Sequence, residues 1–319
     1  MDMLATMRFV RGAVSTKSLV PEMKHFWIKD NTIRGYNGVI ALQSPIDFAV
    51  PCMPLAVPLV AAISKCDEVM SLGLTDSGRL RVQSGPFRSF IECTDVPMPE
   101  IYPQGDLVEL DGPALMKAIQ AVVPFVGSDA SRPWVNGVLL RNKSAFATNN
   151  VCLVQYWIGV ELPLSANIPM EAIREMIRIG APPTHAQVSD HSITFHYSDQ
   201  RWLRTQLYSM DWPDLEGILN RDATYKPVPP ALVDGLDAIK SFLEKDTNVY
   251  LKGDTIYTSE ADGIGASYQV AGLDAVGIYK FEMLMMMASA AKQVDFSTYP
   301  APCCFLNDTM RGVIIGLRP

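Results

Sequence analysis

The chain repeats one plan of roughly 110 residues three times, and this repeat restricts its possible folds more than any single motif does. Each copy contains an apolar strand, a polar turn with a Lys or Arg, a second strand, a turn with Asn, Asp or Gly, and a third strand. The clearest copies of this strand triplet cover residues 26–42, 138–154 and 249–265. A repeat of this length is a duplicated domain, so function should depend on how the copies are arranged.

A helix is expected before and after each strand triplet. Leu115 and Ile119 in the second copy, and Leu232, Leu236 and Ile239 in the third, recur at helical spacing. The six expected helices cover residues 4–14, 55–65, 113–123, 169–179, 230–243 and 280–291. Strands that close each copy are expected at residues 70–74, 78–82 and 90–92, at 193–197 and 202–207, and at 303–306 and 312–315.

Two proline-rich stretches, residues 97–106 and 226–230, separate the copies and are typical of linkers. They predict three domains, at residues 1–106, 107–228 and 229–319. Each domain would be α+β, with two helices on one face of a sheet. Such sheets expose edge strands, so neighbouring domains can pair edge to edge, and a second chain can close the set head to tail.

Composition limits the partners. The formal net charge of −7 means that the surface as a whole repels nucleic acid and anionic membranes, so any DNA binding needs a locally basic surface. The six cysteines have no C-x-x-C spacing and are expected to be buried thiols in a reducing compartment. No signal peptide or membrane-spanning stretch is recognisable. A cytoplasmic protein is therefore expected.

Four motifs carry a resemblance to a known family. They are Ser-Arg-Pro-Trp-Val-Asn-Gly-Val-Leu at 131–139, Ala-Thr-Asn-Asn-Val-Cys-Leu at 147–153, Leu-Arg-Thr-Gln-Leu at 203–207 with Trp-Pro-Asp-Leu at 212–215, and Gly-Val-Ile-Ile-Gly-Leu-Arg-Pro at 312–319. Their order resembles the bacterial-type DNA sliding clamp (beta clamp) family over nearly the whole chain. The resemblance implies that two chains of three DNA-clamp domains form a six-domain ring around duplex DNA. The compact, diverged sequence suggests a phage-encoded member.

Two departures concern the pocket that, in this family, receives short peptide motifs from polymerases and clamp loaders. The family's Thr-Asp-Gly-His-Arg-Leu stands here as Thr-Asn-Asn-Val-Cys-Leu at 148–153, and its Met-Pro-Met-Arg-Leu terminus as Ile-Gly-Leu-Arg-Pro at 315–319. The resemblance therefore implies the pocket's location but not its peptide preference. Its expected residues are Val135, Asn150, Val151, Leu153, Pro213, Leu215, Ile218, Ile315, Leu317 and Arg318.

A sliding clamp holds DNA through few, mobile phosphate contacts. The candidate DNA-binding residues are basic side chains on expected polar helix faces: Arg8, Arg11, Lys17, Lys117, Arg174, Arg178, Lys240, Lys245 and Lys292. Arg174 and Arg178 lie four residues apart on one helix face. The alternative is an ordinary solvated face, since Glu171 and Glu175 share that helix and can pair with them.

An enzyme is the main rival class, but the chain has no phosphate-binding loop, zinc-protease or serine-hydrolase motif. His191 and His196 face opposite sides of an expected strand and cannot chelate one metal together. We therefore expect no catalytic residue, metal or cofactor. The remaining alternative is a clamp-like processivity factor or decoy that binds replication proteins without encircling DNA.

Overall fold

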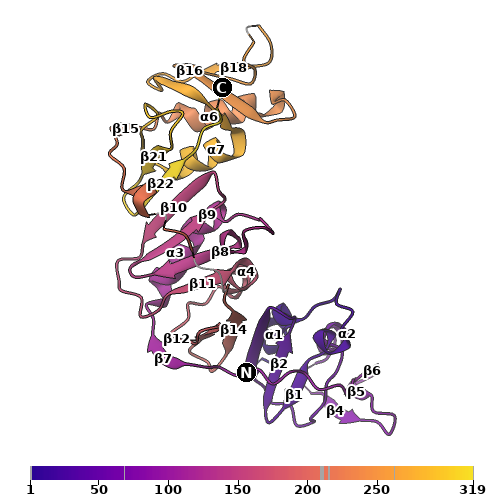
Figure 1. The fold of residues 1–319 in the computed structure, drawn as a ribbon. Coiled ribbons are helices and arrows are strands. Elements are labelled where there is room, and N and C mark those ends of the chain that lie inside the picture. The colour runs from indigo at the N-terminus through magenta and orange to yellow at the C-terminus, as the bar shows by residue number, and fades with distance from the viewer. Residues whose placement is uncertain (1, 68, 209–211, 215, 262, 319) are drawn as a thin grey trace. The chain divides into compact units, whose positions relative to one another are not determined.

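The protein is described by a computed structural model over residues 2–67, 69–208, 212–214, 216–261 and 263–318. The chain divides into two compact units, one of Met1–Met116 with Ile168–Ser209 and one of Lys117–Asn167 with Met210–Pro319. Both units combine helices with sheets (Figure 1). The predicted α+β class is confirmed.

The first unit contains two sheets. The larger has the strand order β1 (Trp27–Lys29), β2 (Thr32–Tyr36), β3 (Ile40–Pro45), β14 (Trp202–Gln206), β13 (Ser192–His196), β12 (His185–Val188) and β7 (Asp106–Glu109). The smaller has the order β4 (Ser71–Leu74), β5 (Leu80–Ser84) and β6 (Phe87–Ile91). In β5 the residues alternate between buried and solvent-facing, as expected for a strand with one face on the core.

The second unit also contains two sheets. The larger has the order β11 (Ala166–Pro169), β8 (Gly137–Arg141), β9 (Ser144–Thr148), β10 (Cys152–Trp157), β22 (Met310–Ile314), β21 (Cys303–Leu306), β20 (Gln293–Val294) and β15 (Lys226–Pro227). The smaller has the order β18 (Ser267–Gln269), β17 (Thr255–Tyr257), β16 (Asn248–Gly253) and β19 (Ala275–Lys280).

The helices supply the other layer. They are α1 (Met3–Val10), α2 (Ala56–Ile63), α3 (Gly112–Val122), α4 (Met170–Ile179), α5 (Glu216–Leu219), α6 (Ala231–Ile239) and α7 (Phe281–Ala290). Short 3₁₀ turns accompany them: η1 (Arg11–Ala13), η2 (Pro21–Lys24), η3 (Val123–Phe125), η4 (Pro133–Asn136) and η5 (Lys240–Phe242). In α1 the Asp2 carboxylate accepts a hydrogen bond from the Leu4 backbone N–H (2.9 Å), which caps the helix, and Met7 and Val10 are fully buried.

Each large sheet joins strands of two successive copies, and it does so in the same way in both units. In the first unit, β3 of the first copy pairs with β14 of the second copy, and Leu42 lies opposite Leu203. In the second unit, β10 of the second copy pairs with β22 of the third, and Leu153 lies opposite Val313. The third strand of one triplet thus binds the last strand of the next copy. Edge-to-edge pairing of the copies, which the sequence predicts, is confirmed at both joins.

The six predicted helices all form, each within a few residues of its expected ends. The third strand of the third triplet is misplaced, because the prediction puts it before residue 265 and the structure has it as β18 at Ser267–Gln269. Gly263 and Gly265 both adopt positive φ angles and belong to the turn instead.

Candidate functional site

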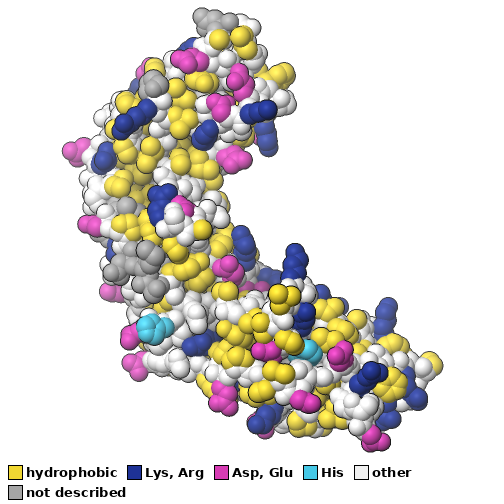
Figure 2. Space-filling model, turned by 45° about the vertical axis from the view of Figure 1, so that its right-hand side comes forward, with side chains coloured by type: hydrophobic (Ala, Val, Ile, Leu, Met, Phe, Trp, Pro, Cys, Tyr) yellow, Lys and Arg dark blue, Asp and Glu magenta, His cyan; other side chains and the backbone are white. Residues whose placement is uncertain are grey.

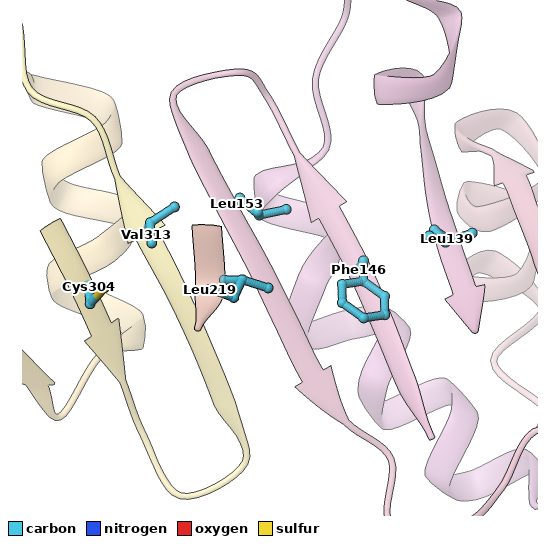
Figure 3. Close-up of a cluster of buried hydrophobic side chains, with 6 residues drawn as sticks. All are labelled: Leu139, Phe146, Leu153, Leu219, Cys304 and Val313. Atoms are coloured by element: carbon cyan, nitrogen blue, oxygen red, sulfur yellow. The ribbon is translucent and has the colours of Figure 1, made fainter. Parts of the chain in front are cut away.

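An apolar pocket lies on one face of the eight-stranded sheet, within the second unit. It encloses about 280 Å³. Leu153 of β10 and Val313 of β22 lie side by side in its floor, because they are partners in the register of these two strands. Figure 3 shows both side chains beside Leu219 of α5. We call this cavity the peptide pocket.

The turn between β9 and β10 forms one rim of the peptide pocket. The Asn149 side-chain oxygen accepts hydrogen bonds from the backbone N–H groups of Val151 (3.1 Å) and Cys152 (2.7 Å). Asn150 has a φ of 71°, a left-handed conformation that asparagine tolerates better than most residues. Asn150 stands where the clamp motif has glycine, so this departure from the motif keeps the turn conformation.

One aromatic side chain, Trp134, also lines the peptide pocket. Its ring meets the ring of Trp212, which lies outside the lining, edge to face with centroids 5.1 Å apart. Arg132, which also lines the pocket, forms an ion pair with Asp129 (2.8 Å). Hydrogen bonds from Ser131 and the Arg132 guanidinium lower the pKa of Asp129 to about 2, so this carboxylate stays ionised at any physiological pH.

The sequence prediction and the pocket overlap in part. Of the predicted residues, those that line the cavity are Asn150, Val151, Leu153, Pro213, Ile218 and Ile315. Val135 is fully buried and lies outside the lining, and Leu215 lies outside the described residues.

Leu317 and Arg318, which are also among the predicted pocket residues, do not line the peptide pocket. The backbone of Leu317 pairs with Ile278 of β19, and its carbonyl accepts a hydrogen bond from the Tyr299 hydroxyl (2.5 Å). These bonds hold the tail on β19, whereas Ile315, with 42% of its surface exposed, stays at the pocket.

Sequence reasoning missed the other lining residues: Arg132, Trp134, Thr148, Cys152, Pro302 and Val313. Arg132, Trp134 and Thr148 belong to the motifs that carry the family resemblance, so a signal for them was present. Pro302 lies 150 residues from Cys152 in sequence, and only the fold brings them together.

All nine predicted DNA-binding residues are exposed. Two of them already have anionic partners. Arg178 pairs with Glu175 in α4 and also donates a hydrogen bond to the backbone oxygen of Phe9 (2.7 Å), at the end of α1. Lys292 pairs with Asp308. The alternative of a solvated face with internal ion pairs therefore applies to at least part of the set.

The buried carboxylate of Glu175 explains why the Arg178 side chain points toward α1 and not away from it. The Glu175 side chain is only 8% exposed, and a Cβ at Gly12 would lie 1.9 Å from its Oε1 atom. The glycine thus makes room for a buried carboxylate, and Arg178 neutralises it. Arg174, one turn earlier on the same helix, has no such structural contact with Glu175 among the bonds described for α4.

Charge on the helices is sparse. On the face drawn in Figure 2, Lys and Arg side chains lie among acidic and apolar side chains. In the third copy α6 carries Asp234 and Asp237, α7 carries Glu282, and neither helix contains a Lys or Arg. Lys240 and Lys245 follow α6 in the sequence. Any contact of this copy with phosphate must come from helix ends and loops.

The described residues contain no cluster of three or more metal-ligating side chains. No helix in the described parts of the chain is long and apolar enough to cross a membrane. The six cysteines are free thiols, and burial raises the pKa of Cys152 to about 12. A thiol with so high a pKa is a poor nucleophile.

Comparison with known proteins supports the fold. No model of a known protein family matches the sequence, and no curated protein matches it. Solved structures do match along almost the whole chain. A Caulobacter crescentus beta sliding clamp, with polyethylene glycol bound to its putative beta-motif tethering region, shares 15% identity with a TM-score of 0.83, covering 99% of this chain and 97% of its own.

Two further structures match over the same shares of both chains. The DNA polymerase sliding clamp of Bacillus subtilis is 13% identical, with a TM-score of 0.81. A DnaN sliding clamp from Bartonella birtlesii bound to griselimycin is also 13% identical, with a TM-score of 0.83. The chain therefore has the fold of the bacterial sliding clamps.

Proposed function

We propose that this chain is a DNA sliding clamp, a ring-shaped processivity factor without enzymatic activity. Two copies of the chain would close a ring of six domains around duplex DNA and tether a DNA polymerase to it. The observation that carries the proposal is the clamp fold over 99% of the chain. The three domains would be residues 1–106, 107–228 and 229–319, in the cytoplasm of a bacterium or a phage-infected host.

The joins inside the chain support a head-to-tail dimer. The third strand of each triplet pairs with the last strand of the following copy, as β3 with β14 and β10 with β22. By the same rule β18, the third strand of the last copy, is left as a sheet edge, and so is β6, the last strand of the first copy. In a second chain β6 would pair with β18, and two such joins would close the ring.

Apolar side chains near these edges support the same join. Phe90 in β6 is 52% exposed. In the third copy Phe242 is 58% exposed; it lies in η5, directly after α6, the helix that packs on β18. Large exposed apolar side chains at a sheet edge are typical of an interface.

The DNA contacts would be made by exposed cations directed at phosphates, without base recognition. We assign the principal contacts to Arg8, Arg11, Lys117 and Arg174, which lie on helices or at their ends. Lys17, Lys240 and Lys245 would contribute from loops and turns. Arg178 and Lys292 would contribute less, because each is paired with a carboxylate.

The peptide pocket would receive short motifs of the polymerase and the clamp loader. Its floor is apolar, Trp134 in its lining is held against Trp212, and it opens on one face of the sheet. Exposed apolar grooves are typical peptide sites. Griselimycin, which is bound to the Bartonella birtlesii clamp, is a suitable probe.

The decisive experiment measures particle mass and shape. We expect twice the chain mass of 35.1 kDa and closed rings of six lobes in negative-stain electron micrographs. The protein should also stay on nicked circular DNA at high salt and slide off once the DNA is linearised. Well-folded particles of single-chain mass without a central hole would support the rival factor or decoy that does not encircle DNA.

A further inference from the structure

A second and larger cavity, which we call the distal groove, lies on the same sheet face as the peptide pocket. It encloses about 530 Å³. On β10, Leu153 lines the peptide pocket and Gln155 and Trp157 line the distal groove; on β22, Val313 lines the pocket and Arg311 the groove. Because alternate residues of a strand point to the same side, both cavities open on one face of the sheet.

Helix α5 separates the two cavities. Its Leu219 packs in one cluster with Phe146, Leu153 and Val313 (Figure 3). Leu153 and Val313 belong to the peptide pocket, whereas Phe146 belongs to the distal groove. The distal groove is therefore a separate site and not an extension of the pocket.

The floor of the distal groove is one row of side chains across the sheet. Phe146, Gln155, Arg311 and Leu306 are successive partners in the strand register. Arg311 Nε donates to Gln155 Oε1 (2.8 Å), and Gln155 Nε2 donates to Ser144 Oγ (2.9 Å).

Arg311 Nη1 also donates to the side-chain oxygen of Asn220 (2.9 Å). These bonds fix the guanidinium in position before any ligand arrives, which lowers the entropic cost of binding.

The walls of the distal groove combine aromatic and cationic groups. Trp157 is 61% exposed at the end of β10, although a tryptophan usually buries most of its surface. The Arg141 guanidinium lies 5.6 Å from the centre of the Phe146 ring. Lys143 is exposed in the turn between β8 and β9. Tryptophan and arginine are both enriched among the residues that contribute most to binding at protein interfaces.

A row in the first unit contains the same pairing of an arginine with a glutamine, with the arginine on the other neighbouring strand. Arg34, Gln43 and Trp202 are partners in that sheet, and Arg34 donates to Gln43 as Arg311 does to Gln155. There the chain itself covers the arginine. The centre of the Tyr102 ring lies 4.6 Å from the guanidinium, and Arg34 has only 6% of its surface exposed. An aromatic ring thus fits over the arginine of this row.

Charge indicates the rest of the ligand. The distal groove is lined by three cations, Arg141, Lys143 and Arg311, and two carboxylates, Glu161 and Asp308. Asp308 is neutralised by Lys292. The exposed Lys143 and Arg311, which bonds to the neutral side chains of Gln155 and Asn220, favour an acidic ligand on this chain of net charge −7. A nucleic acid strand is disfavoured, because its uniform phosphates would meet Glu161, whereas a peptide offers N–H groups to that carboxylate.

We propose that the distal groove is a second peptide-docking site, for an acidic segment that contains an aromatic residue. Carboxylates of the segment pair with Lys143 and Arg311, and its ring packs against Phe146 and Trp157. The site works independently of the peptide pocket and of ring closure, and so goes beyond the proposed function.

The test uses two fluorescein-labelled peptides, Glu-Asp-Phe-Asp-Glu and its neutral counterpart Gln-Asn-Phe-Asn-Gln, with the full chain in a fluorescence-anisotropy titration. We expect the acidic peptide to bind at least tenfold more tightly and to weaken with added salt. Lys143→Glu should raise its Kd at least tenfold, and Trp157→Ala should raise it several-fold. Lys65→Glu, the same change on an exposed residue outside the groove, should leave the Kd unchanged.

Two further variants and probes separate the outcomes. Ile315→Glu should weaken griselimycin binding at least tenfold and leave the Kd of the acidic peptide unaffected. A protein that closes rings and binds griselimycin but shows no preference for the acidic peptide overturns this proposal alone. Equal binding to the Lys143→Glu variant also overturns it. A ten-nucleotide oligothymidylate that displaces the acidic peptide and binds more tightly would identify a nucleic acid site instead. Circular dichroism checks that each variant is folded.

Discussion

Arg178 and Arg174 differ in role although they lie one helical turn apart. Both side chains are exposed, but Arg178 neutralises the buried Glu175 and bonds to the backbone at the end of α1. Removing Arg178 leaves a buried carboxylate without its cation, which costs about 1–3 kcal/mol after allowance for the partial exposure of the pair. Under the proposed function, Arg178 therefore serves stability and Arg174 serves DNA binding.

We expect Arg178→Ala to lower the free energy of unfolding by that amount in urea titrations, and Arg174→Ala to change it by less than about 0.5 kcal/mol. In DNA-binding titrations against salt the order should reverse, because a phosphate contact that is lost reduces the slope by about one. Equal salt slopes for Arg174→Ala and the unaltered chain would remove Arg174 from the DNA contacts.

Ile315 and Arg318 lie three residues apart, but only Ile315 lines the peptide pocket. Its side chain lines the peptide pocket and is 42% exposed, so a charge there meets water rather than the core. Ile315→Glu should weaken griselimycin at least tenfold in calorimetric titrations, with an unchanged melting temperature. Arg318→Glu, which adds negative charge outside the pocket lining, is the control; a similar loss with it would mean that the tail and not the pocket governs binding.

Secondary-structure elements differ in how clearly the sequence encodes them. Leu232, Leu236 and Ile239 recur at helical spacing, so α6 was predictable, as were the strand triplets with their polar turns. Helix α5 has four residues, too few for any periodicity, yet it divides the sheet face into two cavities. Strands β7 and β12 pair across more than seventy residues, and no local pattern specifies that pairing.

The hairpin of β12 and β13 contains a histidine, His196, whose pKa is shifted by its surroundings. His185 and His196 lie opposite each other in the register, and His196 Nε2 is 2.8 Å from Gln187 Oε1. Burial, and then repulsion from His185, lower the pKa of His196 below its usual 6.5.

As pH falls below 6.5, the unfolded chain therefore takes up a proton that the folded chain resists, and stability declines. His196→Gln should flatten the dependence of unfolding free energy on pH between 7 and 5, measured in urea at each pH. His191→Gln, at an exposed position outside this strand pair, should retain the decline, and an equal flattening there would exclude the assignment.

For the whole molecule, the proposed function depends on the arrangement of the copies. The sequence repeat predicted the edge-to-edge pairing of copies that both internal joins show. The peptide pocket was predicted in part, because its location follows from motifs while the path of the tail past Ile315 depends on a backbone pairing with Ile278. The distal groove carries no motif, since its row of side chains comes from strands more than 150 residues apart.

The proposed closure between chains can be weakened at one residue. Phe90→Asp places a charge on an exposed apolar position of β6, an edge strand. We expect mass photometry at nanomolar concentration to change from the two-chain mass to the single-chain mass of 35.1 kDa, with unchanged circular dichroism. Phe242→Asp should act likewise, whereas Val160→Asp, an exposed apolar position outside both edges, should not. Persistence of the larger particle in both edge variants would rule out this join.

The strand joins also limit how this chain can be divided. Because β3 is bonded to β14 and β10 to β22, each large sheet continues past the end of a sequence repeat. A middle copy excised at residues 107–228 would lose the strands that pair with β14 and β10. Both strands would then expose unpaired backbone N–H and C=O groups, and we expect the fragment to aggregate rather than fold alone. The unit that was duplicated in the sequence is therefore smaller than the unit that can be expressed, grafted or exchanged. Truncations of this chain should end within a copy and not at the boundary between two copies.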